Sequence, residues 1–217
     1  MEPRIQQHNL RDQALEILKA RLISGDFAPG EIYSAASLAT ELGVSNSPVR
    51  EAMLTLVNQG LMEAVRNRGF RVIPIRRKQL EDIYEVRLLL EIPTVSKLAG
   101  MPERMRKHEA ELRETIARLH KAAEEGDTIG YLTADKDFHL GLASILGNPY
   151  LVTTVESLCD QVRQYGVRGF NAQTVLSRSA DEHTKILDTI LQGDAASVAK
   201  LMEGHLHKLI EDWGGGD

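Results

Sequence analysis

The first third of the chain alternates short helical patterns with breaks. Residues 10–24 repeat apolar side chains at helical spacing, and a break rich in glycine and proline follows at 25–30. Residues 34–41 predict a short second helix that Ser34 caps. A third helix is predicted over 47–60, because it opens on a Ser-Pro pair and ends on a glycine.

Strand-like patterns appear only after the third helix. The runs 61–65 and 70–75 flank a polar turn at 67–69, which predicts a two-stranded hairpin. Three helices followed by such a hairpin is the order of a winged helix-turn-helix.

The rest of the chain is helical in pattern. Short Gly, Asp, Asn and Pro breaks separate six segments, and short connections between helices favour antiparallel neighbours in a bundle. The segments are 79–98, 103–125, 129–146, 150–167, 175–191 and 195–213. The predicted fold is therefore mainly α, with a winged helix-turn-helix domain over 8–76 and an antiparallel helical bundle over 78–213.

Composition narrows the class of protein. Hydrophobic residues make up 42% and charged residues 26% of 217, which is ordinary globular usage and argues against a disordered chain. No apolar run approaches the ~20 residues that span a bilayer, and the first residues show no secretory signal. One cysteine permits no intrachain disulfide. We expect a cytoplasmic protein without a membrane partner.

Charge is divided unevenly along the chain. Residues 1–77 hold 10 basic and 8 acidic side chains, a net charge of +2, within a chain whose net charge is −5. The stretch 64–77 has five arginines and no acid. This distribution suggests an anionic partner for the first domain, although a solvated surface gives the same pattern.

The third helix and the hairpin supply side chains suited to DNA. Small polar residues at the start of the helix let its backbone approach phosphates, and arginines at a hairpin tip suit the minor groove or the phosphates. The candidate DNA-binding residues are Ser45, Asn46, Ser47, Arg50, Arg66, Arg68 and Gly69.

The segment GVSNSPVREAMLTLVNQGLM, followed by Arg68-Gly69-Phe70-Arg71-Val72, resembles the winged helix-turn-helix of the GntR family of bacterial transcription regulators. The resemblance covers about 10–75 and implies binding to double-stranded operator DNA. Two arginines of the family pattern are replaced here, by Asn46 and Ala36, whereas Arg50 is retained. Because Asn pairs with adenine and Arg with guanine, we expect Asn46 to shift base preference.

A second set of residues suggests a metal site. Asp135 and His139 are four residues apart and share a helical face, while His183 and His205 lie on later helices. One carboxylate and three imidazoles suit Zn²⁺, Ni²⁺, Mn²⁺ or Fe²⁺. A lone histidine on a helix usually has no such role, so the prediction depends on all four converging.

The segment DKDFHLGLASILGN, over 135–148, resembles the signature of the FCD domain, the helical effector-binding domain of the FadR-like subfamily of GntR regulators. His183 and His205 match the remaining ligand positions. The resemblance implies a divalent metal (zinc, nickel or manganese-like) and a small carboxylate effector bound beside it. The predicted number of helices in the bundle, six rather than seven, is more similar to that of the shorter, VanR-like branch.

Two arginines are candidates for binding the effector. Arg87 occupies the usual arginine position of that family, and its fork suits a carboxylate, but an Arg87–Glu91 surface pair explains it equally well. Arg163 is a further candidate.

These features predict a ligand-responsive transcription regulator, with repression as the expected outcome. A homodimer is expected, because one recognition helix covers only a few base pairs. The competing prediction is a metal-dependent enzyme built on a helical bundle, in which the same ligands activate water.

Overall fold

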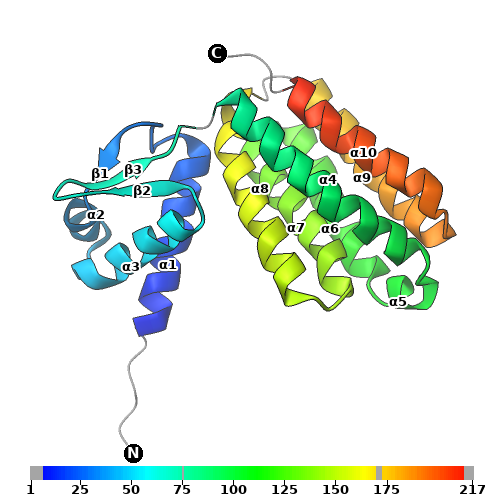
Figure 1. The fold of residues 1–217 in the computed structure, drawn as a ribbon, viewed down its shortest axis with the longest axis horizontal. Helices are drawn as coiled ribbons and strands as arrows, with labels where there is room; N and C mark the ends of the chain where they lie inside the picture. Colours follow the sequence, from blue (N-terminus) through cyan, green and yellow to red (C-terminus); the bar gives the residue numbers. More distant parts are fainter. Residues whose placement is uncertain (1–6, 75, 170–172, 213–217) are drawn as a thin grey trace, which may run out of the picture. The chain divides into compact units, whose positions relative to one another are not determined.

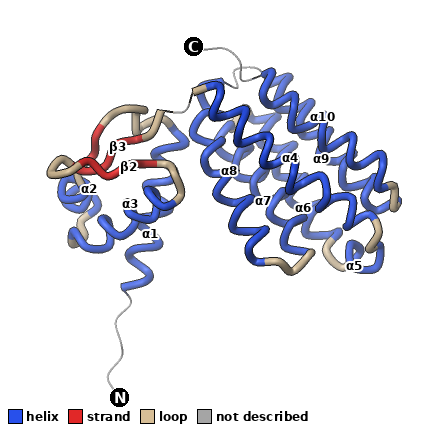
Figure 2. The backbone as a smooth tube through the Cα atoms, in the orientation of Figure 1, coloured by secondary structure: helices blue, strands red, loops and turns tan. Residues whose placement is uncertain are grey.

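A computed structural model describes residues 7–74, 76–169 and 173–212 of the chain. The chain divides into two compact units between Pro74 and Ile75. The described part is mainly helical with one small sheet, which confirms the predicted fold class (Figures 1 and 2).

The N-terminal unit contains three helices and three strands within its described residues. In chain order they are α1 (Gln7–Ser24), β1 (Ile32–Tyr33), α2 (Ala35–Leu42), α3 (Asn46–Asn58), β2 (Met62–Val65) and β3 (Gly69–Val72). The strands pair antiparallel in the order β1-β3-β2, with Tyr33 and Ala64 both opposite Phe70. The sequence predicted only the β2–β3 hairpin, because two residues are too short to show alternation.

Local signals explain how α2 and α3 are placed. The Ser34 side chain accepts a hydrogen bond from the Ser37 amide, as predicted for a cap, and Gly43 ends α2 at a φ of 67°. The prediction that Ser47 is the N-cap of α3 and Pro48 its first residue is wrong by two residues, since Ser45 is the N-cap and α3 begins at Asn46. Pro48 fits inside the first turn because amides there have no acceptor within the helix.

Apolar side chains from all three helices and the sheet form the core of this unit. Leu18, Val49, Met53 and Leu56 are fully buried, and Phe70 of β3 packs into the same cluster. The apolar face of α3 is therefore held inside, and its polar N-terminal turn remains exposed.

The C-terminal unit is an all-helical bundle. Its described residues form seven helices: α4 (Arg77–Ala99), α5 (Pro102–Arg106), α6 (Glu109–Glu125), α7 (Thr128–Ile145), α8 (Pro149–Gly169), α9 (Gln173–Gln192) and α10 (Ala195–Asp212). The predicted segment 103–125 is broken at Lys107 and His108, so the prediction of six helices is wrong. The number of helices therefore no longer supports a similarity to the VanR-like branch.

Glycine-aspartate pairs separate consecutive helices of the bundle as the sequence predicted. Gly126 ends α6 at a φ of 68°, and the Asp127 side chain then accepts from the Gly130 amide at the start of α7. Gly193 has a φ of 80°, and Asp194 caps α10 through the Ser197 amide. Each pair ends one helix and starts the next.

The bundle core is mostly apolar. Leu98, Leu119, Phe138, Leu187 and Met202 are fully buried along its length. A group of charged and imidazole side chains is buried among them. None of the described helices is both long enough and apolar enough to cross a membrane.

Candidate metal centre and nucleic-acid interface

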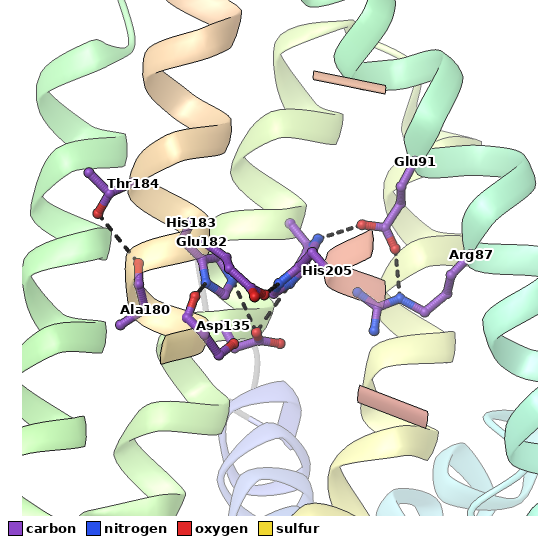
Figure 3. Close-up of polar contacts among 10 residues, drawn as sticks. Arg87, Glu91, Asp135, Ala180, Glu182, His183, Thr184 and His205 are labelled. Atoms are coloured by element: carbon purple, nitrogen blue, oxygen red, sulfur yellow. Dashed lines mark hydrogen bonds and ion pairs between the residues drawn. The ribbon is translucent and has the colours of Figure 1, made fainter. Parts of the chain in front are cut away.

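Four potential ligands converge inside the bundle. Helix α7 supplies Asp135 and His139, α9 supplies His183, and α10 supplies His205. Figure 3 shows Asp135, His183 and His205 facing one another. One ligand atom from each residue lies within 4.8 Å of the others, and all four residues are buried. The structure therefore brings together the four residues that the sequence singled out.

The converging atoms have no hydrogen bond within the described part of the chain. They are Asp135 Oδ1 and the Nε2 atoms of His139, His183 and His205. Asp135 Oδ1 lies 3.1 Å from His183 Nε2 and 3.9 Å from His139 Nε2. Buried polar atoms are normally paired, so four unpaired atoms facing one another fit a cation between them.

Each imidazole is held through its other nitrogen. His183 Nδ1 lies 2.7 Å from the Ser179 carbonyl oxygen, His205 Nδ1 lies 3.0 Å from Glu182 Oε2, and His139 Nδ1 contacts Glu91 Oε2. An acceptor at Nδ1 places the proton there and leaves the Nε2 lone pair facing inward. Metal-ligating histidines are typically oriented in this way.

Electrostatics support the ligand form of these groups. Burial, followed by the neighbouring imidazoles, lowers the pKa of His205 to about 4, so the ring is neutral near pH 7. Burial opposes ionisation of Asp135, but the contact with His183 and the other imidazoles outweighs it and lowers the pKa. A neutral imidazole and an ionised carboxylate are the states that bind a metal.

Arg87 and Glu91 extend the site along α4. Arg87 Nε donates to Glu91 Oε1 at 2.6 Å (Figure 3). The two residues therefore do pair, but both side chains are buried, so the alternative of a pair on the surface is wrong. Burial alone would raise the pKa of Glu91, but Arg87 and His139 bring it to about 2. Arg87 Nη2 is buried without a hydrogen bond in the described region.

Arg163 of α8 is also buried, in a different set of contacts. Its Nη2 donates to Thr133 Oγ1 at 2.8 Å, and its Nη1 lies 3.5 Å from Asp160 Oδ1. The proposed contact of Arg163 with an effector stays a prediction.

Sequence reasoning missed Glu91 and Glu182 as acceptors for the histidines. Glu182 directly precedes His183 in the chain, yet it accepts from His205 on the next helix and also binds Lys208. Glu182 and His205 are 23 residues apart, on two different helices, so their spacing in the sequence gave no signal for this contact.

The candidate DNA-binding residues gather around one hollow of about 510 Å³ in the N-terminal unit. Asn46 and Arg50 of α3 line it from one side, and Arg66, Arg68 and Gly69 of the hairpin line it from the other. Ser45 and Ser47 are exposed beside them: Ser45 occupies the N-cap position of α3 without a side-chain cap hydrogen bond, and Ser47 Oγ donates to Glu51. Recognition helix and wing therefore share one surface.

Gly69 has a backbone role in that surface. Its φ is 130°, and a Cβ added there would lie 2.3 Å from the Tyr33 carbonyl oxygen of β1. Only glycine fits such a close approach of two strands, so Gly69 fixes the position of the hairpin tip.

Comparison with known families agrees with the division of the chain into two units. Residues 10–72 match the model described as bacterial regulatory proteins of the gntR family, and residues 82–208 match the FCD domain. The second match alone spans more than half of the chain.

Curated relatives are similar along most of their length. The chain is 26% identical over 192 residues to the uncharacterized HTH-type transcriptional regulator YdhC of Bacillus subtilis, covering 88% of this chain and 84% of that one. It is 29% identical over 199 residues to the HTH-type transcriptional regulator McbR of Escherichia coli, covering 89% and 85%. It is 27% identical over 199 residues to the gluconate operon transcriptional repressor of B. subtilis, covering 90% and 79%.

A solved structure of E. coli McbR/YncC has the same fold. It superposes with a TM-score of 0.81 at 25% identity, covering 94% of this chain and 97% of that one. Because the families, relatives and fold are those of transcription regulators, the metalloenzyme alternative is wrong.

Proposed function

Because this chain belongs to the GntR family of bacterial regulatory proteins and carries an FCD domain, we propose that it is a metal- and carboxylate-responsive repressor that binds operator DNA as a homodimer. That the chain is a transcription regulator of this type follows from the family itself. The metal, the effector, the dimer and the sign of regulation are the proposal.

The convergence of four buried, unpaired ligand atoms is the observation that carries the proposal. Asp135, His139, His183 and His205 offer one oxygen and three nitrogens, a donor set that suits zinc, nickel or a manganese-like ion. A divalent ion held there supplies positive charge that an anionic ligand can meet. The protein's own part is to fix the three rings through Glu91, Ser179 and Glu182.

The balance of charge around the site favours an anionic effector. Arg87 offsets Glu91 and Lys208 offsets Glu182, while Asp135 offsets one of the two charges of a divalent ion, so the site with its ion carries a net charge of +1. One carboxylate neutralises that excess. Arg87 and Arg163 are the buried arginines of the described bundle, and they are the residues proposed to contact the carboxylate.

The N-terminal unit supplies the DNA contacts. Asn46 and Arg50 present an amide and a guanidinium suited to base edges, and Arg66 and Arg68 suit the minor groove or the phosphates. One recognition helix reads only a few base pairs, so two copies on paired half-sites provide the required affinity. Relatives that are named as repressors, such as the gluconate operon transcriptional repressor, support repression as the outcome.

Coupling between the two activities needs little energy. An effector that changes operator affinity by roughly 5- to 150-fold requires a coupling free energy of only about 1–3 kcal/mol. We therefore expect a measurable effect on DNA binding from ligands of modest affinity.

The deciding experiment compares His205→Ala with His207→Ala. Both histidines lie on α10, but His205 is buried among the ligands and His207 is exposed. After purification with zinc, the wild type and His207→Ala should retain one metal ion per chain by elemental analysis, and His205→Ala should lose it.

Selected operator DNA then tests the response. In gel-shift titrations, candidate acids should weaken binding of the metal-loaded wild type and of His207→Ala, but not of His205→Ala. Equal metal content in both variants would exclude the four-residue site, and an affinity for DNA that no acid alters would exclude the carboxylate effector.

A further inference from the structure

Helix α4 carries an exposed apolar stripe. Leu89 is 69% exposed and Val86 is 41% exposed, while Pro93 is exposed and Leu90 is half-buried. Residues three and four positions apart share one face of a helix, so these four side chains form a continuous apolar surface. The opposite face of α4 is buried in the bundle, where α10 packs beside it (Figure 1). The α4 stripe, defined by these four residues, is therefore left for a partner outside the bundle core.

The proline at one end of the α4 stripe makes a contact there favourable. Pro93 lies inside α4 and has no amide to donate to the carbonyl of Leu89, four residues earlier. A proline inside a helix destabilises it for this reason. A second surface packed on the α4 stripe would offset part of that loss, because it would remove the proline ring and the leucines from water.

One acid and one base extend the α4 stripe by a turn at each end. Asp82 lies four positions before Val86, and Lys97 lies four positions after Pro93. The Asp82 side chain is 54% exposed even though it accepts from Lys78. Lys97 is exposed and has no ion pair among the described residues. At a rise of ~1.5 Å per residue, Asp82 and Lys97 of one chain are ~22 Å apart and cannot meet.

The spacing along this face is the same in both directions. Positions 82, 86, 89, 90, 93 and 97 are separated by 4, 3, 1, 3 and 4 residues. A two-fold axis through the centre of the stripe therefore superposes each position of one helix on a matching position of an antiparallel copy. The resulting contacts are Val86 with the partner's Pro93, Leu89 with the partner's Leu90, and Asp82 with the partner's Lys97.

We propose that the α4 stripe is the two-fold interface between two copies of this chain. The proposal rests on the proposed function, because it assigns a surface to the homodimer named there. The charges select this occupant and this direction: an antiparallel copy brings Asp82 to a lysine at both ends, whereas a parallel copy brings like charges together. Apolar side chains at the centre with charges at the rim are the usual arrangement of such an interface.

The first test measures the dimer of the full chain, without DNA, by sedimentation over a range of concentrations. Val86→Glu and Leu89→Glu bury a carboxylate in the interface and should each weaken the dimer about tenfold or more. Ile129→Glu is the matched control, because Ile129 of α7 is 41% exposed, as Val86 is, but lies on another helix. It should dimerise as the wild type does, and all three variants should keep the helical circular dichroism of the wild type.

The second test exchanges the charges between chains at low ionic strength. Asp82→Lys alone and Lys97→Asp alone each place like charges at both ends of the interface, and each should weaken its own homodimer about tenfold. When the two variants are mixed, opposite charges meet at both ends again. Native mass spectrometry should then show mixed dimers well above the random proportion. Glu81→Lys mixed with Lys97→Asp should show no such excess, because Glu81 pairs with Arg77 away from the stripe.

The outcomes separate this proposal from the homodimer itself. If Val86→Glu and Leu89→Glu dimerise as well as Ile129→Glu, the interface lies elsewhere, the α4 stripe is covered by something other than a second copy, and the homodimer stands. Random mixing of Asp82→Lys with Lys97→Asp would overturn the antiparallel pairing. A wild type that stays monomeric at every concentration, with and without operator DNA, would exclude both the interface and the homodimer.

Discussion

The buried Arg87–Glu91 pair of α4 can be tested against an exposed pair of the same spacing on the same helix. Arg77 and Glu81 are also four residues apart, and a hydrogen bond of 3.1 Å joins their side chains. These side chains are 56% and 41% exposed, whereas those of Arg87 and Glu91 are 1% and 5% exposed. Arg87→Met leaves the Glu91 carboxylate buried without its cation, which costs roughly 3–5 kcal/mol. Arg77→Met removes an exposed pair worth about 0.5 kcal/mol or less.

Urea unfolding followed by circular dichroism, with a chelator present, measures both free energies. The transition of the N-terminal unit serves as an internal reference, since neither substitution touches its core. The double variant Arg87→Met/Glu91→Gln should recover to within about 1–2 kcal/mol of the wild type, because no uncompensated charge remains and the introduced amide oxygen can still accept from His139. Equal and small losses for Arg87→Met and Arg77→Met would refute the account of a buried, coupled pair.

Three further predictions concern single residues. Gly69→Ala should reduce operator affinity at least tenfold in gel shifts, because the added Cβ would lie 2.3 Å from the Tyr33 carbonyl oxygen. The melting temperature of the helical unit should not fall, and an unchanged affinity for DNA would contradict the backbone role of Gly69. Cys159, the sole cysteine, should resist iodoacetamide in the native protein and react fully in urea, because burial raises its pKa to about 12; rapid native labelling would disprove it. If Arg50 contacts a base, Arg50→Ala should weaken operator binding by about 1–3 kcal/mol and relax selectivity for one base pair in a selection experiment. If affinity instead falls equally for all sequences, and the salt dependence of binding has a slope smaller by about one, Arg50 contacts a phosphate.

Local sequence signals predicted most of the elements. Ser34, Gly43 and the Gly-Asp pairs set helix ends through hydrogen bonds and a positive φ that involve only neighbouring residues, so they could be found in the chain itself. Strand β1 could not, because Ile32 and Tyr33 become a strand only by pairing with β3, far along the chain. The break between α5 and α6 was missed for the opposite reason: Lys107 and His108 fit a helix locally, and neither is a glycine or proline.

The candidate metal site could also be predicted only in part from the sequence. Asp135 and His139 could be paired from their spacing, since four residues on a helix fix their relation. His183 and His205 were added as histidines of later helices that could reach the same depth of a bundle, and the resemblance to the FCD domain then matched their positions. The acceptors Glu91 and Glu182 stayed hidden, because each contacts a histidine of a different helix.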